Sequence, residues 1–105
     1  MSLNELSAEA YVERQLELLQ TMTVRKDGRW FVGTLADCTF NALVFQTGSQ
    51  YGINGGRVSK LMVRRNGTYI INYDRGWDIR PRSEEDGLIL DTLVEYFENL
   101  PDDRL

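Results

Sequence analysis

The dipeptide Asn66-Gly67 constrains the fold of this chain more than any other short feature. It separates two runs of alternating polar and apolar residues, Val58 to Arg65 and Thr68 to Tyr73. Both turn residues adopt a positive φ at low cost, as a two-residue primed turn requires, so the two runs are predicted to form an antiparallel hairpin. The turn pairs Arg65 with Thr68, and a regular ribbon repeats this pairing along both runs.

The same two-residue period extends toward the N-terminus. Residues 24–26 and 29–35 flank Asp27-Gly28, which predicts a second hairpin, and residues 39–46 form a further apolar run. We therefore expect a meander of about five antiparallel strands between residues 23 and 73.

Helical periodicity flanks the strand region on both sides. A helix is predicted over about residues 7–22, capped by Ser7, and a second helix over about residues 83–100, ended by Pro101. The apolar residues expected to pack the first helix against the core are Tyr11, Val12, Leu16, Leu19 and Met22. The predicted architecture is a single α+β domain over residues 1–105, with both helices on one face of the sheet.

Composition limits the classes of function. No apolar run approaches the roughly 18 residues of a membrane span, and no signal peptide is apparent, so a cytoplasmic protein without membrane contact is expected. Cys38 is the only cysteine, and we expect it to be a small buried residue. Histidine is absent, which removes the commonest general base and the imidazole ligands of zinc. We therefore expect no catalytic activity, no cofactor and no tightly bound metal.

Charge is distributed unevenly along the chain. Residues 54–82 carry seven basic and two acidic side chains, whereas residues 83–105 carry one basic and eight acidic side chains. This asymmetry can mark an anion-binding surface, or the acidic helix can neutralise the basic strands within the fold. Internal neutralisation is the interpretation we favour.

Two polar loops contain the best candidates for a site. The glycine-rich loop Gly48–Lys60 can cradle an anion with its backbone amides, aided by Arg57, Ser59 and Lys60. It lacks the spacing of a phosphate-binding loop and opens no helix, which favours a structural loop that needs positive φ.

The second polar loop follows Tyr73. Asp74 and Asp78 can act as an acid–base pair or hold a metal, although ion pairing with neighbouring arginines is the simpler role. A regular ribbon continues to Val58 opposite Arg75, which predicts an ion pair between Arg57 and one of the two carboxylates. Trp77 and Tyr51 would then shield a single polar site.

The predicted hairpin also alternates basic and aromatic side chains on one face. In the regular register Arg64 faces Tyr69, Met62 faces Ile71 and Lys60 faces Tyr73. Lys60, Arg64, Tyr69 and Tyr73 would then suit phosphate contacts and base stacking by single-stranded nucleic acid. The acidic pI of about 4.8 argues against nucleic acid as the partner.

Two motifs resemble a known family. YGINGGRVSKL, from Tyr51 to Leu61, and YDRGWD, from Tyr73 to Asp78, are similar to the signature of a family of short bacterial and phage-related proteins of unknown function. The similarity runs from Trp30 to Phe97 and implies a domain of this extent, with no activity attached.

Three functional hypotheses follow. The first is a non-enzymatic binding or regulatory module that contacts a protein or a small anionic ligand through residues 48–60 and 74–81. Its candidate binding residues are Tyr51, Arg57, Ser59, Lys60, Asp74, Arg75, Trp77 and Asp78. The alternatives are a nucleic-acid-binding accessory protein and, more weakly, a metal-assisted hydrolase on Asp74 and Asp78. The sequence leaves the oligomeric state open, including a homo-oligomer.

Overall fold

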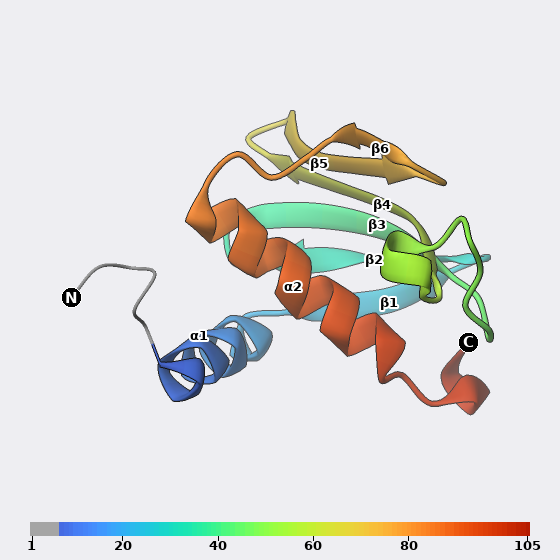
Figure 1. Cartoon of the computed structure of the whole chain (residues 1–105), viewed down its shortest axis with the longest axis horizontal. Helices are drawn as coiled ribbons and strands as arrows, with labels where there is room; N and C mark the ends of the chain where they lie inside the picture. Colours follow the sequence, from blue (N-terminus) through green and yellow to red (C-terminus); the bar gives the residue numbers. More distant parts are fainter. Residues whose placement is uncertain (1–6) are drawn as a thin grey trace.

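The computed structural model describes residues 7–105 and shows two helices on one face of a six-stranded antiparallel sheet (Figure 1). The helices are α1 (Ala8–Gln20) and α2 (Glu84–Glu98). The strands, which neighbour one another in chain order, are β1 (Thr23–Asp27), β2 (Trp30–Leu35), β3 (Cys38–Val44), β4 (Val58–Arg65), β5 (Thr68–Asp74) and β6 (Trp77–Ile79). The α+β class and the antiparallel meander are confirmed, and β6 is a strand that was not predicted.

Short 3₁₀ turns and side-chain caps complete the secondary structure. The turns are η2 (Ile53–Gly55) and η3 (Asp102–Arg104). Ser7 Oγ accepts a hydrogen bond from the Ala10 amide, and Ser83 Oγ accepts one from the Asp86 amide, each at 3.1 Å. Both helices therefore begin at a capping serine, which confirms the predicted cap at Ser7 and the predicted start of the second helix at residue 83. In the described part of the chain, neither helix is long and apolar enough to cross a membrane.

The positions of the two hairpin turns agree with those predicted from the sequence to within one residue. Asn66 and Gly67 have φ of 51° and 78°, which confirms the primed turn between β4 and β5. In the first hairpin Asp27 pairs with Trp30, so the turn residues are Gly28 and Arg29 and not Asp27-Gly28. Gly28 alone of these two has a positive φ, which suits a turn with glycine at its first central position.

A bulge changes the register of β4 and β5. Arg65 pairs with Thr68 and Arg64 with Tyr69, as predicted, but Ile70 is then skipped and Leu61 pairs with Tyr73. The predicted pairing of Tyr73 with Lys60 is therefore wrong by one residue, as is that of Met62 with Ile71.

The bulge places apolar side chains on the face that the helices cover. Ile71 and Tyr73 are 0% and 6% exposed on that face, so burying them favours the extra residue in the strand. The core there joins α2 to the strands, and the ring of Phe97 lies 5.2 Å from that of Phe31 and 6.0 Å from that of Phe40.

Helix α1 packs differently from the prediction. Val12 and Leu16 are 49% and 54% exposed, and the buried residue of α1 is Gln15. Polar contacts join α1 to α2: Gln15 Nε2 donates to Glu95 at 3.2 Å, Arg14 pairs with Glu85, and the Tyr11 hydroxyl donates to Asp91. Because α2 turns acidic side chains toward α1, the polar side of α1 faces α2, and Val12 and Leu16 of its apolar stripe are exposed. The predicted packing of Met22 is confirmed: it lies partly buried against the core, as does Leu18.

Candidate functional site

The two polar loops meet at one end of the sheet. The Tyr73 hydroxyl donates to the Tyr51 carbonyl at 2.7 Å, and the Arg75 amide donates to the Ser59 carbonyl at 2.9 Å. The Arg75 guanidinium lies 4.3 Å above the centre of the Tyr51 ring. The predicted convergence of the Gly48–Lys60 loop with the segment after Tyr73 is therefore confirmed.

A pocket of about 340 Å³ lies where they meet. It is lined by Leu43, Phe45, Ser49, Tyr51, Ser59, Lys60 and Arg75. Phe45 and Tyr51 are 41% and 43% exposed, so two aromatic rings stand at the surface beside two cations. This combination suits an anionic group attached to an apolar or aromatic body.

The two cations differ in their electrostatic surroundings. Lys60 Nζ lies 3.4 Å from Asp74 Oδ1, and the Asp74 side chain is 61% exposed. Arg75 forms no ion pair with any of residues 7–105. Its conformation is unusual, with φ of 59°, so the β5–β6 turn holds a side-chain-bearing residue in the left-handed region. Arg75 is thus the cation best placed to receive an external anion.

Arg57 does not belong to this pocket. Its guanidinium donates to the carbonyls of Phe45 at 2.9 Å and of Glu98 and Leu100 at 3.0 Å each, and lies 3.6 Å from Asp102. The expected ion pair with Asp74 or Asp78 is wrong. The end of α2 passes beside β4, and its unsatisfied carbonyls attract the guanidinium.

The other residues of the Tyr73–Pro81 segment have structural partners. Asp78 accepts a hydrogen bond from Asn72 Nδ2 at 3.3 Å. The Trp77 ring packs edge-on against Tyr73 at 5.1 Å, and the Arg80 guanidinium lies 5.1 Å from the Trp77 ring. Within residues 7–105, no three His, Cys, Asp or Glu side chains are grouped so as to hold a metal ion.

The glycine-rich loop uses its amides internally. The amides of Ser49, Gly52, Gly55 and Gly56 donate to carbonyls of the same loop. Asn54 and Gly55 have φ of 54° and 73°, the left-handed backbone that the sequence interpretation required. The loop is therefore a folded support for Tyr51 and not a cradle of free backbone amides.

The proposed nucleic-acid face is only partly assembled. Arg64 lies 5.7 Å from the Tyr69 ring centre and donates to Asn41 at 3.0 Å, on the sheet face away from the helices. Lys60 lies on that face too, since it pairs with Asp74 one step beyond Leu61 and Tyr73. Tyr73 is buried on the opposite face, because the bulge moves it there.

Several basic strand residues are neutralised within the fold. Arg65 forms ion pairs with Asp37 and Asp86, both at 2.9 Å, and the second reaches from β4 to α2. The contacts of Arg57 with the end of α2 likewise place a basic side chain against the acidic C-terminal part of the chain. The charge asymmetry of the sequence thus reflects, in part, contacts between the sheet and the C-terminal helix, as we favoured.

Cys38 is buried, as predicted, with 1% of its surface exposed. Burial raises the pKa of its thiol to about 11, against a usual value of 9.0. The thiol is therefore protonated near neutral pH and chemically unreactive there.

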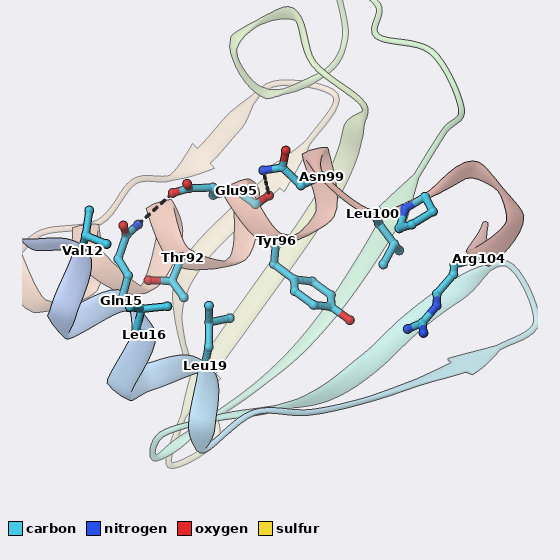
Figure 2. A pocket seen from close by; sticks show the side chains of 11 residues that line it. Val12, Gln15, Leu16, Leu19, Thr92, Glu95, Tyr96, Asn99, Leu100 and Arg104 are labelled. Carbon is cyan, nitrogen blue, oxygen red and sulfur yellow. Dashed lines mark hydrogen bonds between the residues drawn. The ribbon is translucent and has the colours of Figure 1, made fainter.

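A larger groove lies elsewhere, between α1 and α2, and was missed by the sequence analysis (Figure 2). Its volume is about 480 Å³, and its lining includes Val12, Gln15, Leu16 and Leu19 of α1 and Thr92, Glu95, Tyr96 and Asn99 of α2. The apolar stripe of α1 is visible in the sequence, but we assigned it to the core. Nothing in the sequence of α2 alone shows which of its sides faces α1.

Comparison with models of protein families identifies the family of the chain. A model of a domain of unknown function, DUF7678, matches residues 29–98. The chain belongs to this family. The match includes both polar loops, α2 and all of β2 to β6, whereas α1 and β1 lie outside it. No curated protein and no solved structure matches the chain significantly.

Proposed function

We propose that this DUF7678 domain is a non-enzymatic binding or regulatory module that takes an anionic group at the pocket between its two polar loops. The observation that carries the proposal is the meeting of Lys60 and Arg75 at one pocket beside the exposed ring of Tyr51. The anionic group belongs either to a small ligand or to an acidic segment of a protein.

The local charges favour a phosphate or carboxylate. The guanidinium of Arg75 can form two parallel hydrogen bonds to such a group, and stacking on Tyr51 holds its plane in place. Lys60 adds a second positive charge, and because Asp74 is largely exposed, an incoming anion can compete with it for Lys60. Phe45 and Tyr51 both line the pocket and are partly exposed, so their rings supply apolar contact at its edge.

The test is a titration of the isotopically labelled chain, followed by amide chemical shifts. Inorganic phosphate and a phosphoserine peptide serve as probes, which separates a small anion from an anionic protein segment. Both probes are expected to shift the amides of Tyr51, Ser59 and Arg75. Arg75→Ala should abolish these shifts, since it removes the pocket cation that forms no ion pair with any of residues 7–105.

Arg25→Ala is the matched control, because Arg25 is a 71% exposed arginine on β1, at the other edge of the sheet. It should leave the shifts unchanged. Equal phosphate shifts in the Arg75→Ala variant, or equal losses in both variants, would show that the pocket is not an anion site.

One observation favours nucleic acid as a second candidate. Arg64 Nε is buried without a hydrogen-bond partner among residues 7–105, and the guanidinium lies near the exposed ring of Tyr69. Lys60, Arg64 and Tyr69 thus offer two cations and one stacking surface on the open sheet face. Titration with single- and double-stranded oligonucleotides at about 50 mM salt tests this candidate. Micromolar affinity that is lost on charge reversal at Lys60 and Arg64 would support it.

The proposal also includes three expectations that come from the sequence. The protein acts in the cytoplasm, its family is bacterial or phage-related, and the segments Tyr51–Leu61 and Tyr73–Asp78 are the signature that the family shares. The location of both segments inside the matched region 29–98 supports the last expectation.

A further inference from the structure

Helix α1 presents the middle of its apolar stripe to solvent. Val12 and Leu16 are about half exposed, while the polar Gln15 is buried against α2. An amphipathic helix at a protein surface ordinarily buries its apolar stripe, because removing that surface from water is favourable. Here the polar side of α1 is already used in contacts with α2, so the apolar stripe remains available for another molecule.

The stripe forms one wall of the groove between α1 and α2. Figure 2 shows Leu19 of α1 and Tyr96 of α2 on either side of the same space, with Arg104 at one end. At about 480 Å³ the groove has room for several side chains of a partner. Its lining comes from about two turns of each helix, and a groove between two helices can accept a third helix with apolar anchors one turn apart.

The surroundings of the groove are acidic. Glu9, Glu13 and Glu17 are exposed on α1, and Glu95 of α2 lines the groove itself. The basic residues nearby are fewer: Arg104 lines one end of the groove, and Arg14 of α1 is paired with Glu85. The segment 83–105, which supplies the other wall, carries eight acidic side chains and one basic one. A cationic partner complements this charge, whereas a second copy of the chain, or any other acidic surface, would be repelled.

We propose that this groove binds an amphipathic helix of a partner protein, with large apolar residues at spacings of three and four and with lysine or arginine beside them. The apolar residues contact Val12, Leu16 and Tyr96, and the basic residues face the carboxylates of α1 and α2. The groove is distant in sequence from the anion pocket, and α1 lies outside the region that the family model matches. The inference is therefore independent of the proposed function.

The test uses a fluorescent synthetic peptide of about 15 residues, long enough for a marginally stable helix. It carries leucines at spacings of three and four and lysines elsewhere. Saturable binding to the full chain is expected, measured by anisotropy, and it should weaken as salt rises from about 50 to 200 mM. Leu16→Gln should weaken binding about tenfold, because it removes an apolar contact at the centre of the stripe.

Tyr69→Gln is the matched control, since Tyr69 is a 43% exposed apolar side chain on the open face of the sheet. It should leave peptide binding unchanged. Glu13→Lys with Glu17→Lys should weaken the lysine peptide and favour a peptide in which glutamate replaces lysine. Leu16 is 54% exposed, so its replacement should preserve the melting temperature, and Val12→Gln provides a second variant of the same kind.

Four results would overturn the inference. The first is equal binding of a peptide with the same composition but scrambled spacing, and the second is equal binding of the glutamate peptide to the unmodified chain. The third is no binding at any accessible concentration. The fourth is self-association of the chain that Leu16→Gln abolishes, because a second copy would then be the occupant of the groove.

Discussion

At the scale of single residues, the structural role of Arg57 is determined by contacts with residues that are distant in the sequence. It is 13% exposed, and it bonds to the carbonyls of Glu98 and Leu100, more than 40 residues away in the sequence. Glu98 is the last residue of α2 and Leu100 follows it closely, at the end where a helix leaves acceptors unsatisfied and carries partial negative charge. The residue therefore fastens the C-terminal end of α2 to β4.

Arg57→Ala is expected to lower the free energy of unfolding by about 2–3 kcal/mol, because it leaves several partly buried carbonyls without donors. Arg57→Lys should recover only part of this loss, since an ammonium cannot reproduce the fork of donors. Urea unfolding of both variants, with Arg25→Ala as the exposed control, measures the effect. An Arg57→Ala protein that is as stable as the unmodified chain but no longer binds phosphate would instead show that Arg57 is part of the ligand site.

At the scale of elements, two glycines define how α2 is built and held. Gly56 lies against Glu98, whose carboxylate accepts hydrogen bonds from the amides of Arg57 at 2.7 Å and Val58 at 3.3 Å. A methyl group at position 56 would collide with that carboxylate. Gly87 lies within α2, and a methyl group there would meet only open space. Gly56 is therefore needed for the close contact with Glu98, whereas Gly87 only weakens α2.

Opposite effects on stability are therefore expected from the same substitution. Gly87→Ala should raise the free energy of unfolding by about 0.5–1 kcal/mol, because alanine loses less backbone entropy in a helix. Gly56→Ala should lower it, because the Glu98 carboxylate must move away from the amides that it accepts. Thermal and urea unfolding of the two variants provide the comparison. A stabilised Gly56→Ala protein would show that the Glu98 contact contributes nothing.

At the scale of the whole molecule, the two helices differ in how firmly they are attached. Helix α2 contributes Ile89, Leu93 and Phe97, each 0% exposed, to the core that it shares with the sheet. Helix α1 fully buries Gln15 alone, packs the partly buried Leu18 on the edge of the core, and is otherwise joined to α2 through polar side chains that water can replace. The sheet and α2 therefore form the stable unit, and α1 is held less firmly than α2.

Native-state hydrogen exchange should reveal this gradient. Amides of α1 are expected to exchange through local opening, whereas those of α2, β3 and β4 should exchange only through global unfolding. Mass spectrometry of peptides from the full chain measures both classes at once. Equal protection of α1 and α2 would contradict the expectation and would imply that the polar contacts contribute more than their exposure suggests.

Features that depend on local sequence were predictable, and features that depend on distant contacts were not. The Asn66-Gly67 turn and the capping serines follow from neighbouring residues, and they place the hairpin and both helices correctly. The partner of Arg57, the outward face of α1 and the position of Tyr73 depend on where α2 crosses the sheet. The candidate site was accordingly predicted in part: its loops converge, but Arg57 lies outside the pocket.

The bulge at Ile70 changes what a deletion in β5 would do. Removing one residue from a strand normally turns every later side chain to the opposite face. Ile70, however, has no partner in the ladder, and the pairs from Val63–Ile71 to Lys60–Asp74 are complete without it. A chain lacking Ile70 would join these pairs directly to Arg64–Tyr69 and leave Tyr73 in the core. Ile70, which makes a prediction based on regular alternation wrong, is thus also the residue of β5 that can be removed without moving the later side chains to the opposite face.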